Sequence, residues 1–133
     1  MYHNHLYIES NTTSLRFKNQ ITMRVSKNEI TLAQNDEEVK LNYDELRKAV
    51  LVLRAVNHKL RQQIIDLLDN NGQMTVTDLY VKLRLEQSVA SQHLAILRRA
   101  GVVVTEREGK FIYYGLDKNR LAQINGLVEN LIV

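Results

Sequence analysis

The 133-residue chain contains no cysteine, which excludes disulfide bonds, thiolate metal sites and thiol-based redox sensing together. It also has no run of about 18 apolar residues, so no transmembrane helix is predicted. The first ten residues, MYHNHLYIES, lack a basic segment followed by an apolar stretch, and we expect no secretory signal. These absences predict a soluble, cytoplasmic protein of about one domain's length with no membrane role.

The sequence also lacks the common patterns of catalytic sites. None of the five glycines lies in a G-x-G-x-x-G or P-loop pattern, and no nucleophile motif or paired-acid constellation is present. We therefore predict no enzymatic activity and no cofactor. His93 has no carboxylate at a suitable helical spacing, which favours a hydrogen-bonded residue beside the core. His3 and His5 form an H-x-H pair without further ligands, so no functional metal site is predicted.

Positive charge is concentrated in one short region. The formal net charge is +3, yet residues 1–41 carry five basic and five acidic side chains and are neutral. Residues 82–110 carry six basic and three acidic side chains, an excess of three. A local basic patch is typical of a nucleic-acid surface, although an ordinary solvated face explains the charge alone equally well.

Residues 1–41 alternate apolar and polar side chains, as β-strands do. In SLRFKNQITMRVSKNEITL the alternating apolar positions are Leu15, Phe17, Ile21, Met23, Val25, Ile30 and Leu32. Residues 26–29 are the candidate turn of a hairpin. An isolated hairpin is marginal in water, so this extension either packs on something or is partly disordered. Met23 is an alternative natural start, which would make residues 1–22 dispensable.

Residues 42–133 show helical spacing and are predicted to form a separate domain. The first helix follows Asn42, whose side chain can accept from free N–H groups of the first turn, with Glu45 three residues later. The second helix takes Asn57 as its N-cap and stops at Asn-Asn-Gly, residues 70–72.

The third helix is predicted to be short, beginning with the cap pair Thr75 and Asp78 and ending near Arg84. The fourth helix covers SVASQHLAILRRAG, residues 88–101. Its inward positions, spaced i, i+4 and i+7, are Ala90, Leu94 and Leu97. Its outward positions are Ser88, Ser91, Gln92, Ala95 and Arg99.

A hairpin and a last helix complete the predicted domain. Two β-rich runs in VVVTEREGKFIYYGL flank a charged turn at residues 107–110, and the last helix begins with Asp117 as its cap. The third and fourth helices followed by a basic hairpin indicate a helix-turn-helix with a wing. The predicted fold class is therefore mainly α (α+β), a winged helix-turn-helix of order α-α-α-α-β-β-α with an N-terminal extension.

The outward face of the fourth helix is suited to the major groove of DNA. Glutamine pairs bidentately with adenine, and serine donates or accepts without blocking close approach. The candidate base-reading residues are Ser88, Ser91 and Gln92. Basic side chains around them would hold phosphates, giving affinity without reading sequence. The candidate phosphate ligands are Lys82, Arg84, Arg98, Arg99, Arg107 and Lys110. The alternative is a solvated helix that merely tolerates its serines, and the basic hairpin argues for DNA.

The last helix is more apolar than one buried stripe requires. Six aliphatic residues occupy the twelve positions from Leu121 to Ile132, and the first helix has a similar surplus. Such a surplus predicts a homodimer in which both helices pack against a second copy. The candidate interface residues are Val50, Leu53, Ile124, Leu127, Val128 and Leu131.

Over residues 43–118 the chain resembles the ArsR/SmtB family of winged-helix repressors. The resemblance rests on NHKLRQQIIDLL, on VTDLYVKLRLEQSVASQHLAILRRAGVV and on REGKFIYYGLD. It implies a homodimer that binds operator DNA and represses nearby genes. The alternative is a winged-helix module that has lost DNA binding and pairs with another protein.

The chain departs from the family at its metal sites. Thr75 and Thr77 stand where the family's thiolate site has cysteines. At the second family site Asp117 matches the first ligand, but the positions near the expected histidines are held by Asn119, Asn130 and Val133. The resemblance therefore implies DNA binding without a metal signal, and it names no inducer.

Overall fold

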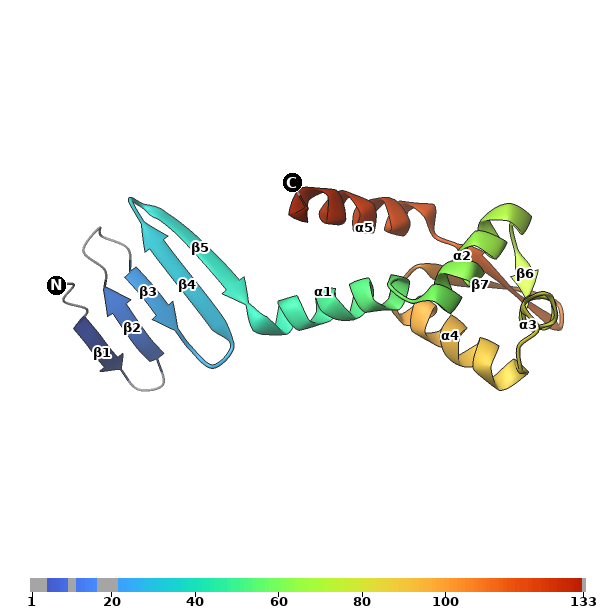
Figure 1. The fold of residues 1–133 in the computed structure, drawn as a ribbon, viewed down its shortest axis with the longest axis horizontal. Helices are drawn as coiled ribbons and strands as arrows, with labels where there is room; N and C mark the ends of the chain where they lie inside the picture. The colour runs from blue at the N-terminus through green and yellow to red at the C-terminus, as the bar shows by residue number, and fades with distance from the viewer. Residues whose placement is uncertain (1–4, 10–11, 17–21, 133) are drawn as a thin grey trace. The chain divides into compact units, whose positions relative to one another are not determined.

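The computed structural model describes residues 5–9, 12–16 and 22–132, with side chains from residue 22 onward. The chain forms two compact units, Met1–Val50 and Leu51–Val133 (Figure 1). The boundary predicted after residue 41 lies at the end of β5 (Glu37–Asn42), next to α1 (Tyr43–Val56). The two compact units divide further on, inside α1, so this helix contributes to both.

The first unit contains a five-stranded antiparallel sheet. Its strands follow one another in sequence order and are β1 (His5–Glu9), β2 (Thr12–Arg16), β3 (Thr22–Val25), β4 (Glu29–Gln34) and β5 (Figure 1). The predicted hairpin is its β3–β4 pair: Val25 lies opposite Ile30, and the Ser26 N–H donates to the Glu29 carbonyl at 2.9 Å. The sequence therefore predicted one hairpin of a larger sheet. Positions 17 and 21 lie outside the described residues.

The first two helices begin at side-chain caps. The Oδ1 atom of Asn42 accepts the N–H groups of Asp44 and Glu45 at 2.9 and 3.1 Å, which confirms the predicted start of α1. The predicted N-cap of α2 (Lys59–Asn71), Asn57, is wrong. The N–H of Asn57 still donates to a carbonyl of α1, and His58 caps α2 instead by accepting the Leu60 N–H at 3.2 Å.

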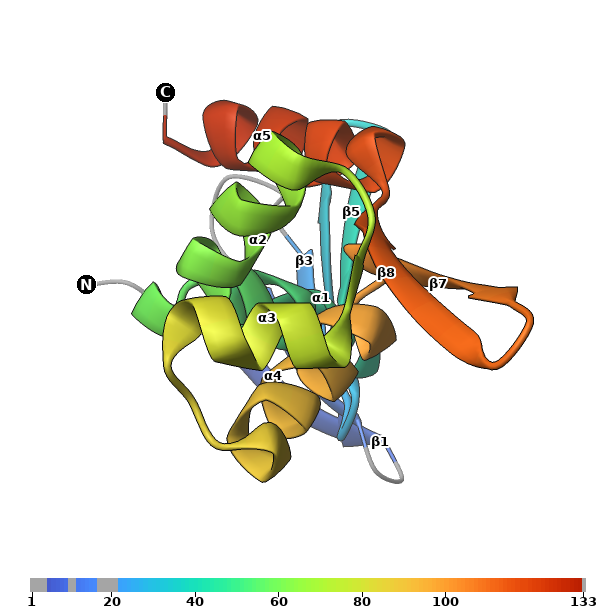
Figure 2. The same cartoon turned by 90° about the vertical axis from the view of Figure 1, so that its right-hand side faces the viewer.

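The helices α3 (Val76–Leu83) and α4 (Gln87–Arg99) form the helix-turn-helix. As predicted, Thr75 caps α3, because its Oγ1 atom accepts the Asp78 N–H at 3.2 Å. The α3 helix ends at Arg84, which adopts a left-handed conformation with φ of +54°. The tight turn that follows leads directly into α4, and the two helices lie against each other (Figure 2).

The wing is the hairpin of β7 (Val103–Glu108) and β8 (Phe111–Leu116), and it projects from the helices (Figure 2). Its predicted charged turn is present, with Gly109 at φ +60°. A short strand that the sequence did not predict, β6 (Met74–Thr75), pairs with β8 and gives a sheet of order β6-β8-β7. The helix α5 (Lys118–Leu131) follows, capped by Asp117 as predicted.

The core of the second unit holds α4 in place. The most completely buried large side chains are Ile64, Leu68, Leu79, Leu94, Leu97, Val102 and Val103. Ala90, Leu94 and Leu97 are all buried, which confirms the predicted inward face of α4. The winged helix-turn-helix predicted from the sequence is therefore the fold of this unit. Among the described residues, no helix combines the length and apolar character needed to cross a membrane.

Candidate nucleic-acid interface

The exposed face of α4 carries the three candidate base-reading residues. Ser88, Ser91 and Gln92 are all exposed, while Leu94 and Leu97 on the inner side of the helix are buried in the core. Burial of the inner face fixes the rotation of the helix about its axis. The small polar side chains are therefore presented outward on a rigid element, as a helix that enters a groove of DNA requires.

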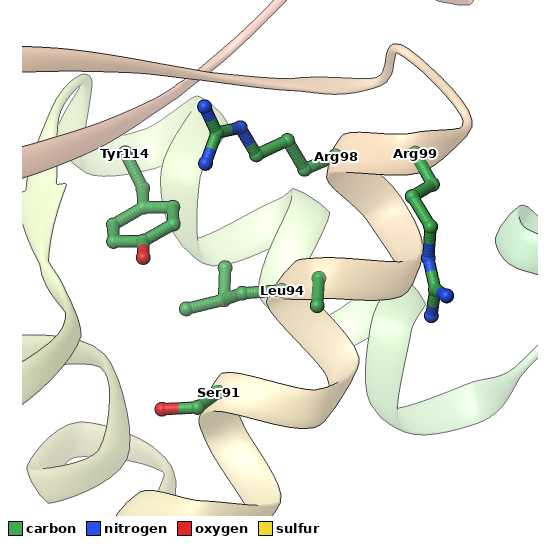
Figure 3. A pocket seen from close by; sticks show the side chains of 6 residues that line it. Ser91, Leu94, Arg98, Arg99 and Tyr114 are labelled. Atoms are coloured by element: carbon green, nitrogen blue, oxygen red, sulfur yellow. The ribbon is translucent and has the colours of Figure 1, made fainter.

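A hollow lies beside this face, between α4 and the wing. It is lined by Ser91, Leu94, Ala95, Arg98 and Arg99 of α4 and by Tyr114 of β8. Figure 3 shows Ser91 and Arg98 on the side of α4 that faces Tyr114, whereas Arg99 extends from another side of the helix. The side chains of Arg98 and Arg99 therefore point away from different sides of α4. A guanidinium facing a phenol suits a phosphate group, which accepts hydrogen bonds from both kinds of side chain.

Tyr114 is the residue of this hollow that sequence reasoning missed. It is half-buried, and its backbone lies opposite both Met74 of β6 and Thr105 of β7. The available signal was the alternation in KFIYYGL, which places Ile112 and Tyr114 on the same face of the strand.

The six candidate phosphate ligands are all exposed and come from α3, the turn after it, α4 and the wing. Hydrogen bonds orient two of them: Lys82 donates to Asn71 at 3.1 Å, and Arg107 donates to the Gly109 carbonyl at 3.0 Å. The Lys110 ammonium lies 5.4 Å from the centre of the Phe111 ring. In the described part of the chain, the ion pairs involve other cations. These positive charges therefore remain available to an external anion.

A buried arginine links α4 to the end of α1 through hydrogen bonds. Arg61 donates to the carbonyls of Ala55 and Arg54 at 2.6 and 3.0 Å, close to the end of α1. Its third contact is to Nδ1 of His93 on α4, at 3.2 Å, and that nitrogen must accept because a guanidinium only donates. The prediction that His93 is a hydrogen-bonded residue beside the core is therefore confirmed.

This cluster disfavours the protonated form of His93. Burial is the largest influence that lowers the pKa of His93 below its usual value, followed by the His58 ring and the Arg61 guanidinium. The two histidine rings lie 5.0 Å apart between centroids. The N–H on Nε2 is then the tautomer that leaves Nδ1 free to accept.

The positions of the family's metal ligands have other tasks here. Thr75 caps α3 and also donates its hydroxyl to Asp78 at 2.9 Å, and Asp117 accepts the Arg120 N–H at 3.0 Å. Asn119 and Asn130 are exposed, and Val133 lies outside the described residues. Within the described ranges, no three His, Cys, Asp or Glu side chains come together as metal ligands would.

Five of the six candidate interface residues fall into two groups. Ile124 is 9% exposed and belongs to the core of its own protomer, and Leu53 and Val128 pack against that core. Leu127 and Leu131 are 45% and 68% exposed. Val50 is half-buried. The apolar surface of α5 that a partner could cover is therefore centred on Leu127 and Leu131.

Comparisons with known proteins give the same winged-helix fold and the same class of protein, transcriptional regulators. The model of the arsR family of bacterial regulatory proteins matches residues 58–105. The chain is 38% identical over 84 residues to the transcriptional activator HlyU of Vibrio cholerae, covering 63% of this chain and 77% of that one. It is 38% identical over 81 residues to the transcriptional repressor SdpR of Bacillus subtilis, with coverage of 61% and 89%.

A solved structure supports the same assignment. NolR from Sinorhizobium fredii superimposes with a TM-score of 0.55 at 32% identity, covering 67% of this chain and 88% of that one. The helix-turn-helix, the wing and these relatives agree, and they indicate a transcriptional regulator, not an enzyme. The chain belongs to the ArsR family of winged-helix, DNA-binding transcriptional regulators.

Proposed function

We propose that this protein is a dimeric repressor that reads its operator through α4. The observation that carries the proposal is the exposed row of Ser88, Ser91 and Gln92 on a helix whose other side is locked into the core. In the major groove, Gln92 is suited to pair with adenine through two hydrogen bonds, and the serines adapt to either base partner.

The basic side chains around α4 would supply affinity. Lys82 and Arg84 precede the helix, Arg98 and Arg99 end it, and Arg107 and Lys110 lie on the wing. Contacts from these residues to phosphates position the protein on the duplex but carry no sequence information. The hollow beside Arg98 and Tyr114 is the place where we expect a DNA backbone to enter between the reading helix and the wing.

Repression would follow from a two-fold symmetric dimer occupying a promoter. A two-fold dimer presents two copies of α4, which fit half-sites about one helical turn apart, and the operator should be correspondingly palindromic. A dimer held across a promoter blocks access to that DNA. The relatives include both a named repressor and a named activator, so the direction of regulation is tested by transcription from a promoter that contains the selected site.

A second candidate function rests on the wing. Val104, Phe111 and Ile112 are apolar, and each is about half exposed. Val104 and Phe111 lie on one face of the hairpin and Ile112 on the other. Exposed apolar side chains of this kind also suit a winged-helix module that has lost DNA binding and uses the wing to pair with another protein. The two candidates differ in their dependence on salt, because only phosphate contacts release counterions from DNA.

The deciding experiment is selection of bound duplexes from a random DNA pool, followed by salt titration of the selected site. A repressor should enrich a palindromic sequence. The logarithm of its binding constant should fall linearly with the logarithm of the salt concentration, with a slope near the number of phosphates contacted. If no sequence is enriched and binding to DNA shows no salt dependence, the protein-pairing function replaces the repressor.

A further inference from the structure

The sheet of the first unit has one apolar and one polar face. The register places Met23, Leu32 and Val39 opposite one another across β3, β4 and β5, and a second row contains Val25, Ile30 and Leu41. Because alternate residues of a strand point to opposite faces, these six share one face. The intervening row on the other face contains Arg24, Thr31 and Lys40.

The apolar face is left open within the protomer. Leu32, Val39 and Leu41 are 42%, 62% and 45% exposed, although they lie in neighbouring strands on one side of the sheet. A sheet gains its stability by covering an apolar face, and one left in water is marginal. Contiguous exposed apolar residues of this kind mark an interaction surface.

The charge of this unit disfavours nucleic acid, anionic membranes and strongly charged proteins as partners. Residues 1–50 carry seven basic and seven acidic side chains, so the unit is neutral while the rest of the chain carries the excess of three. A neutral surface gains no long-range attraction to a charged partner. It also opposes self-association very little.

The shape of the face points to a second copy, and its area requires that the sheet contact be combined with another contact. Two sheet faces pack well against each other about 10 Å apart, with strands nearly aligned. Five strands of four to six residues give a face of roughly 400 Å², about half of the roughly 800 Å² that each partner buries in a stable complex. Val50, already proposed as a dimer contact, belongs to the same compact unit.

We infer that the N-terminal sheet packs through its apolar face against the same sheet of a second copy, forming a β-sandwich between protomers. A second copy is always present at the same concentration as the first, and it presents the same apolar, uncharged sheet face. This contact adds to the helix contacts of the proposed dimer and extends the interface into a part of the chain that reads no DNA.

The first test compares Val39→Asp with Lys40→Asp in the full chain. Val39 is mostly exposed in the protomer, so aspartate is tolerated there, but a carboxylate in a sheet-to-sheet interface would be buried without a partner. We expect the dimer dissociation constant, measured by sedimentation over a dilution series, to rise at least about 100-fold for Val39→Asp. Lys40→Asp introduces the same residue on the opposite face and should change the constant less than about threefold.

The second test leaves the sequence unchanged. Hydrogen exchange of the wild-type chain is followed by mass spectrometry while the protein is diluted through its dissociation constant. We expect the amides of residues 22–42 to lose protection on dilution, because the sheet loses its cover, while those of α4 keep theirs. Protection of the sheet that is independent of concentration would show that its own chain covers the face and would overturn the inference.

The outcome is separable from that of the proposed dimeric repressor. If Leu131→Asp abolishes the dimer and Val39→Asp leaves it unchanged, the helix dimer stands and the sheet contact is wrong. If the reverse holds, the sheet inference stands without the helix contact. Equal dissociation constants for Val39→Asp and Lys40→Asp count against the sheet contact in either case.

Discussion

Gln92 is the residue on which sequence reading should depend most. It is exposed on α4 and offers both a donor and an acceptor to a base edge. We expect Gln92→Ala to weaken binding to the selected operator by about 1–3 kcal/mol and to relax specificity at one position of each half-site. Competition titrations with single-base operator variants measure both effects. Equal losses on selected and random DNA would remove α4 from the reading role.

Lys110 provides the matching change at a position that we propose holds DNA without reading its sequence. It lies in the turn of the wing, exposed, with its ammonium near the Phe111 ring. Lys110→Ala should weaken binding to every sequence by a similar factor and reduce the salt slope by about one. A sequence-dependent loss with an unchanged slope would instead place this side chain against a base edge.

His93 should make the stability of the fold depend on pH. Its pKa is lowered in the folded chain, chiefly by burial and then by His58 and Arg61, so the unfolded chain binds a proton more readily. The free energy of unfolding must therefore fall as pH drops below about 6.5, the value expected in the unfolded chain, until the lower folded pKa is reached. Above about pH 6.5 the neutral ring makes its full contribution to the free energy of unfolding.

The variant His93→Asn separates this titration from the hydrogen bond. Asparagine places an oxygen where Nδ1 lies and can still accept from Arg61, but it does not titrate. Urea unfolding between pH 8 and pH 5 should give a shallower dependence on pH for His93→Asn than for the wild type. Identical slopes in the two proteins would show that other groups control the acid response.

At the scale of elements, local chemistry made the helices predictable and tertiary context decided the rest. The starts of α1, α3 and α5 follow from side-chain caps at Asn42, Thr75 and Asp117, which need only a few neighbouring residues. The start of α2 could not be found in this way. Asn57 is the better cap by residue type, but its N–H completes the last turn of α1.

The strands were harder because their partners lie elsewhere in the chain. The β4–β5 hairpin turns at Asn35 and Asp36, whose φ values of +48° and +67° suit the left-handed positions of a two-residue turn. The sequence therefore contains a signal for this turn, but the signal lacks glycine and the β4–β5 hairpin was not predicted. The strand β6 has only two residues and exists through its pairing with β8. The same pairing places Tyr114 at the candidate site.

The exposed end of α5 is the element on which we expect a second copy to pack. Leu127 and Leu131 are open in the protomer, while Ile124 is already buried, so aspartate at 131 should leave the protomer folded. We expect Leu131→Asp to shift the protein from dimer to monomer at micromolar concentration and to weaken operator binding, since each half-site would then bind alone. Light scattering gives the mass, and circular dichroism checks the fold. A dimeric Leu131→Asp would exclude α5 from the interface.

At the scale of the whole molecule, charge and apolar surface are divided between the two units. The neutral first unit carries an open apolar sheet face, and the second carries the net positive charge beside the helix-turn-helix. Association and DNA binding can therefore be altered separately. A change in the sheet should affect operator affinity only through the dimer, whereas a change in α4 should affect it directly.

Metal ions should not release this protein from its operator. Zinc needs about four ligands of the cysteine, histidine or carboxylate type, and soft metals and arsenite prefer thiolates. The chain has no thiolate, and the Thr75 hydroxyl is engaged as a helix cap. Asp117 caps α5, and Asn119 and Asn130 cannot replace histidines. We expect zinc, cadmium and arsenite at one equivalent per protomer to leave operator affinity unchanged, as measured by fluorescence anisotropy.

The control for this prediction is a variant in which His3 and His5 are both replaced by glutamine. These two histidines form the H-x-H pair of the sequence, and they lie in the neutral unit, far along the chain from α4. Release of the wild type by one equivalent of zinc, lost in the double variant, would assign the metal response to the N-terminal unit. If both proteins instead hold their operator at every metal concentration near stoichiometry, regulation must act through the amount of protein, through a ligand without a metal, or through a partner that disturbs the dimer.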